Sequence, residues 1–331
     1  MITMKDIAKK VGVSQATVSR VISGNFSVNP ETKMKVMELV RKLDYQPNII
    51  AQSLVGNKSL LIGEIIPDIS NPFFADVIKA VESEATKDGY SIILFNTDYK
   101  IEKEKKYINI LKSYNVDGIL IVPSNSKDKY FKSLNNIGLP IVVITQDVPN
   151  FSCVSISHYV GGQEVAKHLI NMGYSKFVFV GSDEDDKFNG FKAKIRNSGF
   201  DIEKDIILIN NEKYKSDSID LQNFINDNIE HNSIGIFALN DIEALIVMHV
   251  LKEMKVEIPE KVALIGFDNT FISKEVSPTL SSVAQPIEEI GRQAIEMLID
   301  KICKKENTEE KHVILEPRLV VRESTVKSVK Y

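Results

Sequence analysis

The first fifty residues carry apolar side chains at the spacing of short α-helices. Thr3 is a cap for a first helix, and Asp6, three residues later, supplies the reciprocal carboxylate of a capping box. Gly12 ends this helix where a left-handed residue costs little. The apolar stripe between these two ends consists of Ile7, Ala8 and Val11. We therefore predict a helix of about two turns.

Two further helices follow at once. Ser14 caps the second, whose inner face is formed by Thr17, Val18, Val21 and Ile22. Asn29-Pro30 opens the third, with an inner stripe of Val36, Val40 and Leu43. Helices this short bury too little surface singly. Three of them around one small core predict a helix-turn-helix unit.

From Leu60 onward, short apolar runs alternate with helical segments. The expected strands are 61–66, 91–97, 118–122, 141–145, 177–180, 206–209, 234–239 and 262–267. The expected helices are 73–88, 102–114, 127–136, 190–197, 218–228 and 241–254. Continuous Ile, Val and Leu runs indicate parallel strands buried on both faces. The pattern predicts an α/β protein with two doubly wound parallel sheets in tandem, which bind ligands beyond the carboxyl ends of their strands.

Charge divides unevenly along the 331 residues. Residues 1–59 hold nine Lys and Arg against four acidic residues, a net charge of +5. Since the whole chain carries −4, the remainder carries −9. A basic head on an acidic body suits a protein that touches phosphates with one end. Chance clustering of solvated lysines is the alternative.

The second helix is the candidate for reading DNA. Its outward residues are Gln15, Ala16 and Arg20, which reach base edges when a helix lies in the major groove. Glutamine pairs with adenine, arginine with guanine, and an alanine methyl touches thymine. From spacing alone, a small three-helix bundle with a solvated polar face remains open.

Three motifs carry a family resemblance: Asp6-Ile-Ala, Gly12-Val-Ser and Thr17-Val-Ser-Arg20. Dense and in order, they resemble the headpiece of the lactose-repressor (LacI/GalR) family of bacterial transcription regulators. The resemblance implies operator DNA as the partner of a homodimer. The DNA contacts predicted are Thr3, Ser14, Gln15, Ala16, Thr17, Arg20, Asn25, Asn29, Tyr45, Asn48, Ala51 and Leu54.

The segment after the third helix is short and punctuated. Pro47 starts a helical turn and Gly56 stops it, so an isolated helix here is marginal in water. It is either a linker or a hinge helix that orders when two copies meet on DNA. The resemblance favours the hinge and implies that Leu54 wedges into a minor-groove base step.

The remaining chain resembles the periplasmic sugar-binding fold of the same family. The domains we expect are a headpiece at 1–46, a hinge helix and linker at 47–59, and an effector-binding core at 60–331. By analogy the chain crosses between the core halves three times. The first subdomain is then about 60–156 and 286–314, and the second about 157–285 and 315–331.

The candidate effector contacts lie at strand ends. The resemblance implies that Asp268 and Asn240 bind effector hydroxyls, because they match positions that the family uses for this purpose. The adjacent aromatic residues Phe73 and Phe74 either stack on a ligand or belong to the core. Lys187 stands where the family usually has arginine, and lysine lacks the planar fork that binds a diol through two hydrogen bonds. The full predicted set is Phe73, Phe74, Gln146, Lys187, Tyr214, Asn240 and Asp268.

The acidic run Asp183-Glu-Asp-Asp186 is expected to be a solvated loop, and both cysteines, Cys153 and Cys303, to be reduced and buried. The five histidines have no metal-ligand spacing, and no catalytic or dinucleotide-binding motif is present. We therefore expect no enzyme activity, no cofactor and no metal.

These patterns predict an effector-responsive transcription regulator, most simply a repressor, that acts in the cytoplasm and binds a sugar or sugar derivative in the cleft between its core halves. With no leader or membrane-spanning run expected, a solute-binding protein of a transport system is the rival from another class, and a sugar-modifying enzyme is a third alternative.

Overall fold

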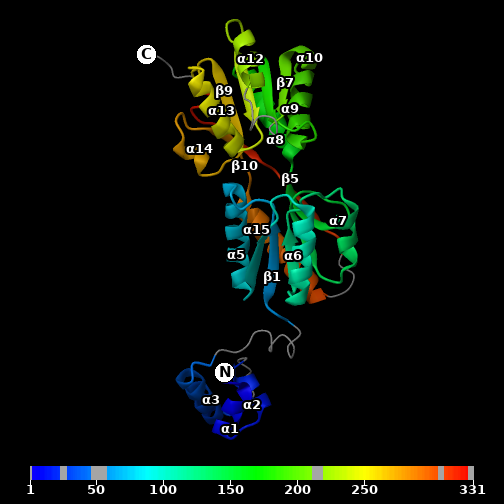
Figure 1. The fold of residues 1–331 in the computed structure, drawn as a ribbon, viewed down its shortest axis with the longest axis vertical. Helices are drawn as coiled ribbons and strands as arrows, with labels where there is room; N and C mark the ends of the chain where they lie inside the picture. Colours follow the sequence, from blue (N-terminus) through cyan, green and yellow to red (C-terminus); the bar gives the residue numbers. More distant parts are fainter. Residues whose placement is uncertain (1, 23–27, 46–57, 211–218, 305–308, 327–331) are drawn as a thin grey trace. The chain divides into compact units, whose positions relative to one another are not determined.

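The computed structural model describes residues 2–22, 28–45, 58–210, 219–304 and 309–326. The chain divides into a small unit within residues 1–60 and a large unit that holds most of residues 61–331 (Figure 1). Each unit is described by itself. Within the described residues, no helix is both long and apolar enough to cross a membrane.

Three helices form the small unit: α1 (Met4–Val11), α2 (Gln15–Ile22) and α3 (Pro30–Lys42). The predicted capping box is confirmed, because the amide of Asp6 donates to the Thr3 hydroxyl and the Thr3 amide donates to the Asp6 carboxylate. Gly12 has the expected left-handed φ of 78°. The core of the unit consists of Ile7, Ala8, Val18, Val21 and Val36.

The large unit contains two six-stranded sheets. The strands of the first are β1 (Leu61–Ile66), β2 (Ser91–Asn96), β3 (Gly118–Ile121), β4 (Ile141–Thr145), β5 (Ser152–Ile156) and β11 (His312–Leu315). They are all parallel, in the order β11-β5-β4-β3-β1-β2.

The second sheet repeats this plan. Its strands are β6 (Lys176–Gly181), β7 (Ile206–Asn210), β8 (Ile234–Ala238), β9 (Val262–Asp268), β10 (Ser281–Ala284) and β12 (Arg318–Val320). Their order is β12-β10-β9-β8-β6-β7, with only the β10–β12 pair antiparallel among the described strands. The predicted α/β class with two parallel sheets is confirmed.

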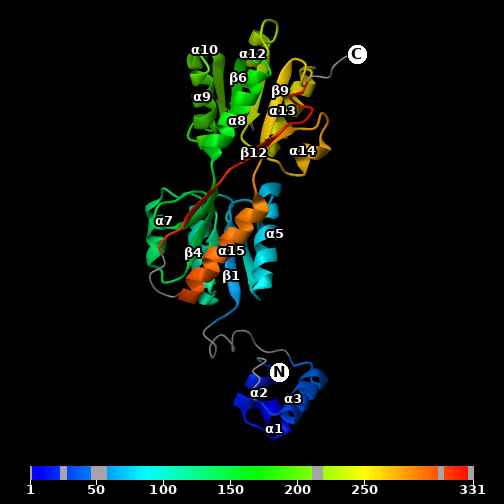
Figure 2. The same ribbon diagram turned by 180° about the vertical axis from the view of Figure 1, so that it is seen from behind.

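Helices connect and cover the strands of both sheets. In the first half these are α5 (Pro72–Lys87), α6 (Ile101–Ser113), α7 (Lys129–Ser133), the 3₁₀ turn η1 (Leu134–Asn136) and α15 (Ile287–Lys304). In the second half they are α8 (His158–Asn171), α9 (Asp186–Asn197), α10 (Ile202–Asp205), α12 (Ile219–Asn228), α13 (Asp241–Glu253) and α14 (Ile272–Glu275). Figures 1 and 2 show α6 and α15 on opposite faces of the first sheet.

The chain passes between the sheets where one strand or helix ends and the next begins in the other half. These passages lie between β5 and α8, between β10 and α15, and between β11 and β12. Residue boundaries of the domains and subdomains remain predictions.

One sequence-based expectation about local structure is confirmed in part, and one is wrong in part. Asp183 and Glu184 lie in an exposed turn, as expected of a solvated loop, but Asp185 caps α9 through the Lys187 amide and Asp186 is the first helical residue. Both cysteines are free, but only Cys153 is buried, whereas Cys303 is exposed.

Glu64 is an anomaly in the core of the first half. It alternates along β1 with Ile62 and Ile66, on the face covered by α5 and α15, and it is fully buried. Neither carboxyl oxygen has a hydrogen-bond partner among the described residues. A charged carboxylate in this place would be strongly penalised, so burial raises the pKa of Glu64 to about 8.

We expect Glu64→Gln to weaken the dependence of stability on pH. The folded-state pKa exceeds the ordinary value of 4.5, so the free energy of unfolding should fall as pH rises from about 4.5 to about 8. The slope is at most about 1.4 kcal/mol per pH unit. Denaturant unfolding across this pH range measures it.

The matched control is Glu102→Gln, since the Glu102 side chain is 84% exposed. This control should keep the pH profile of the original chain. Equal profiles for Glu64→Gln and the original chain would contradict a buried, protonated Glu64.

Candidate functional site

The outward face of α2 is the candidate surface for reading DNA. Gln15, Ala16 and Arg20 are all exposed, while Val18 and Val21 of the same helix are buried. The three predicted base-reading residues therefore lie on the face of α2 away from its core. This arrangement is what a helix in a major groove requires.

Some of the predicted DNA contacts also cap the helices of the small unit through their side-chain hydroxyl or amide groups. The Ser14 hydroxyl accepts from the Thr17 amide at 3.1 Å and is hydrogen-bonded to the Thr17 hydroxyl at 2.9 Å. Asn29 Oδ1 accepts from the Glu31 amide at 2.8 Å. Thr3 donates its hydroxyl proton to Asp6 at 2.7 Å. These predicted DNA contacts thus have structural functions as well.

The other predicted DNA contacts divide into two groups. Tyr45 is half-buried and packs against the core of the small unit. Outside the described residues lie Asn25, Asn48, Ala51 and Leu54, together with the predicted effector contact Tyr214.

In the second half, two predicted effector contacts lie around the end of β9. Asp268 is the last residue of β9 and is buried, with Gln285 Nε2 donating to its carboxylate at 2.5 Å. Lys187, in the first turn of α9, is also buried and donates to the Leu239 carbonyl at 3.1 Å. Its ammonium lies 4.3 Å from the centre of the Phe267 ring.

Electrostatics tie these groups together. Burial raises the pKa of Asp268 to about 6, while the positive charge of Lys187 and the Gln285 hydrogen bond act in the opposite direction. His158, the first residue of α8, packs edge-on against Phe267 with ring centres 5.7 Å apart. Burial, aided by Lys187, lowers the pKa of His158 well below its ordinary value. The sequence reading missed His158 as a member of this group.

The backbone at Asp268 is unusual and has an identifiable support. Asp268 and Asn269 both have positive φ, 93° and 51°, a region that non-glycine residues rarely adopt. Buried Asp241 accepts from the Thr270 amide at 2.6 Å, from the Thr270 hydroxyl at 2.9 Å and from the Ser282 hydroxyl at 2.5 Å. These bonds hold the turn that follows Asp268.

Asp241 was not predicted, because an acidic residue in the first turn of a helix is usually a favourable partner of the helix dipole and needs no other function. Burial raises the pKa of Asp241 to about 7, although the three hydrogen bonds from Thr270 and Ser282 act to lower this pKa. Asn240, beside it, caps α13 by accepting from the Glu243 amide at 2.8 Å.

The packing of α8 on α9 places Lys187. A Cβ at Gly190 would lie 1.9 Å from the Tyr159 carbonyl oxygen, and one at Gly162 would lie 2.0 Å from the Lys187 carbonyl oxygen. Only glycine at both positions lets the two helices come this close. The backbone of Lys187 is therefore fixed by helix packing as well as by its side-chain contacts.

The predicted effector contacts of the first half pack in the core or bond to the backbone. Phe73 and Phe74 are both buried in the core, with ring centres 5.2 Å apart. Gln146, directly after β4, is half-buried and donates to the Pro123 carbonyl at 3.3 Å. Their contact with an effector stays a prediction.

Comparisons with known proteins agree with both units. A model described as bacterial regulatory proteins of the lacI family matches residues 3–48, and a periplasmic binding protein-like domain matches residues 166–325. The HTH-type transcriptional regulator RegA of Clostridium saccharobutylicum is 32% identical over 332 residues, covering 98% of this chain and 99% of RegA.

Two solved structures are similar to the large unit. A periplasmic binding protein/LacI transcriptional regulator from Alkaliphilus metalliredigens, complexed with D-xylulofuranose, is 33% identical with a TM-score of 0.71, covering 81% of this chain and 99% of that one. A LacI family regulator from Enterococcus faecium with bound ribose is 28% identical with a TM-score of 0.69, covering 80% and 98%. With the helix-turn-helix face and the paired parallel sheets, these likenesses establish that the chain belongs to the LacI family of bacterial transcription regulators.

Proposed function

We propose that this regulator represses transcription by binding a two-fold-symmetric operator as a homodimer, and that a sugar bound near Asp268 changes its affinity for DNA. The observation that carries the DNA-binding half is the exposed row of Gln15, Ala16 and Arg20 on a capped helix. The observation that carries the effector half is a buried Asp268 next to a buried Lys187.

The homodimer is supported by an argument about DNA geometry. One recognition helix reads only a few base pairs, and two-fold symmetry doubles the specific contacts at a fixed spacing. The second half also has an apolar groove of about 760 Å³ beside α13. It is lined by Leu245, Met248, His249, Val256, Ile258 and Pro278 among others, and Leu245 is 41% exposed. We assign this groove to the second copy of the chain.

A sugar suits the chemistry at the end of β9. An ionised carboxylate accepts several hydrogen bonds, so Asp268 has acceptor capacity for neighbouring hydroxyl groups beyond its bond with Gln285. Asn240 adds a donor and an acceptor, and the Lys187 ammonium is a point donor without the planar fork of arginine. The pentoses in the two similar structures support a small polyhydroxyl effector here.

The effector would act by changing how the two halves of the core meet. Lys127, after β3, and Glu184, before α9, form an ion pair at 3.4 Å across these halves. Both side chains are about four-fifths exposed, so this pair contributes little stability and opens readily. A sugar that favours one arrangement would then shift the population able to bind DNA.

Neither rival class fits the residues as well. A solute-binding protein for transport would have no use for the exposed Gln15 and Arg20 of a helix-turn-helix unit. For a sugar-modifying enzyme, Asp268 and Lys187 would have to act on the bound ligand, whereas the two similar structures with bound sugars are those of transcription regulators. We therefore propose a regulator without catalytic activity.

An electrophoretic shift assay with random genomic fragments tests DNA binding directly. Selective retention of some fragments is expected, and affinity for them should fall steeply as salt rises, because the +5 charge of residues 1–59 releases counterions from DNA. An absence of retention, or a flat plot of log affinity against log salt, would contradict the proposed function.

Arg20→Ala should weaken operator binding by about 1–3 kcal/mol and relax the preference at one operator position. Arg41→Ala, on the exposed surface of α3, removes the same charge and is the matched control. It should weaken binding about equally on every sequence. Competition binding on operators varied one base pair at a time measures the difference. If Arg20→Ala lowered affinity uniformly as well, Arg20 would be a phosphate contact.

Asp268→Asn should stabilise the folded protein at neutral pH and abolish its response to sugar. The folded-state pKa of about 6 lies above the ordinary 3.8, so the stability that this group contributes is complete at low pH and is lost as pH rises through about 6. Asparagine keeps the acceptor for Gln285 but lacks the charge.

Thermal unfolding and operator binding in the presence of ribose or xylulose measure the two effects. Exposed Asp220 on α12 is the matched site, and Asp220→Asn should change neither. A sugar response that survives in Asp268→Asn would place the effector site elsewhere.

A further inference from the structure

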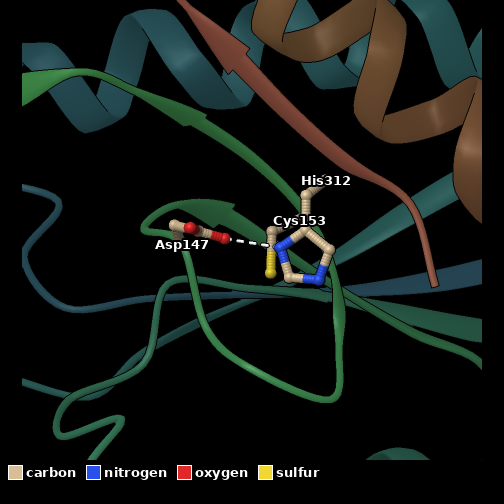
Figure 3. A group of neighbouring side chains, drawn as sticks. All are labelled: Asp147, Cys153 and His312. Atoms are coloured by element: carbon tan, nitrogen blue, oxygen red, sulfur yellow. Dashed lines mark hydrogen bonds and ion pairs between the residues drawn. The ribbon is translucent and has the colours of Figure 1, made fainter.

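Three metal-binding side chains meet at one edge of the first sheet (Figure 3). Asp147 follows β4, Cys153 lies on β5, and His312 is the first residue of β11. One potential ligand atom from each lies within 4.8 Å of the others. Figure 3 shows the imidazole of His312 turned towards the carboxylate of Asp147, with the side chain of Cys153 beside it.

Sheet pairing brings these distant residues together. His312 is the register partner of Cys153 in the parallel β5–β11 pair, and the Cys153 amide donates to the Lys311 carbonyl at 2.8 Å. The loop that carries Asp147 is tied to the same cysteine, because the Val148 amide donates to Cys153 Sγ at 3.3 Å. Backbone contacts therefore hold the three residues next to one another.

The Asp147–His312 pair orients the imidazole. His312 Nδ1 lies 2.5 Å from Asp147 Oδ1, and both side chains are partly exposed, at 36% and 50%. The thiol beneath them is fully buried. One side of the cluster is thus open to solvent and the other is closed by protein, which is the arrangement of a site that an ion enters from outside.

The geometry points to a Zn²⁺-type site formed by Cys153 Sγ, His312 Nδ1 and Asp147 Oδ1, with a fourth position left for water. Sulfur, imidazole and carboxylate are the three protein donors that zinc uses, at about 2.0–2.3 Å. Soft thiolate together with imidazole disfavours Mg²⁺ and Ca²⁺, which prefer oxygen ligands. Small side-chain rotations are needed, since donors around such an ion lie farther apart than the hydrogen-bonded Asp147–His312 pair.

Binding follows a simple proton balance. The hydrogen between His312 and Asp147 is replaced by the ion as the imidazole takes the tautomer protonated at Nε2, and the Cys153 thiol loses its proton to solvent. Burial, with the negative charges of Asp147 and Glu310, raises the pKa of Cys153 to about 11 without metal. A divalent cation reverses this effect, because coordination stabilises the thiolate directly.

A bound ion would link the loop after β4 to β11, the strand directly before the passage from β11 to β12. It would thereby restrain one of the connections between the two core halves. This site is separate from the effector groups at the end of β9, and it does not depend on the proposed function.

Cobalt titration of the full-length protein tests the site. We would use a Cys303→Ser background, because the exposed Cys303 is the other thiol of the chain. One equivalent of Co²⁺ should produce a thiolate charge-transfer band and the visible bands of a tetrahedral ion, and one equivalent of Zn²⁺ should remove both.

Three variants assign the ligands. Cys153→Ser should remove the thiolate band, and His312→Ala should weaken Co²⁺ binding by at least about tenfold. His231→Ala is the matched control, since this histidine is exposed in the turn after α12 and lies outside both proposed binding sites, and it should change nothing. His312→Ala keeps the test decisive if the buried Cys153→Ser variant fails to fold, which thermal unfolding would reveal.

Two results would overturn the inference. Co²⁺ binding without a thiolate band would mean that Cys153 is not a ligand. Binding of equal strength in His312→Ala and in the background protein would mean an adventitious ion at other surface residues.

Discussion

The left-handed turn after β9 is the constraint on which the candidate effector site depends. Asp268 and Asn269 both adopt φ values that side chains normally avoid, and this conformation decides where the Asp268 carboxylate points. The turn persists because Asp241 accepts from both polar groups of Thr270 and from Ser282 of the neighbouring strand. A residue outside the predicted effector contacts therefore sets the direction of the residue that we expect to bind ligand, at the cost of burying a second carboxyl group close to the first.

Buried acids in this protein differ in how their acceptor capacity is used. Asp241 is surrounded by three donors, which is what a structural carboxylate requires. Glu64 has no such donor among the described residues, so its protonated form has the lower free energy at neutral pH. Asp268 lies between these cases, with one donor from Gln285 and the charge of Lys187 nearby. A carboxylate that is stabilised but not saturated is suited to receive hydroxyl groups from a ligand.

Local rules predicted much of this fold, and long-range pairing explains the rest. The Thr3–Asp6 capping box, Gly12 and the long apolar runs are encoded within a few residues, so the headpiece helices and eight strands could be recognised. Of the four strands that were not recognised, β5 has five residues, but two serines interrupt its apolar run. Strands β10, β11 and β12 have only three or four residues each, and the β10–β12 and β5–β11 pairs join segments far apart along the chain. The same limit hid the Asp147–Cys153–His312 cluster, because spacing rules look for ligands that are close in sequence.

At the effector site, adjacent aromatics such as Phe73 and Phe74 suit a core and a ligand equally well, and only burial favours the core.

The caps of the headpiece also suggest which polar residues are suited to DNA phosphates. A helix cap accepts a hydrogen bond from a backbone amide, whereas a phosphate needs a donor, so one side chain can satisfy both. Asn29 caps through Oδ1 and keeps its amide hydrogens for another partner. One hydrogen bond joins the hydroxyls of Ser14 and Thr17, and only one of the two hydroxyl protons is used in it. The other hydroxyl can therefore donate its proton to a phosphate oxygen. Thr3 differs, because its hydroxyl proton already goes to Asp6, and a phosphate contact there would have to break the capping box. Among the predicted DNA contacts that cap helices, Ser14, Thr17 and Asn29 are therefore better suited than Thr3 to bind a DNA phosphate.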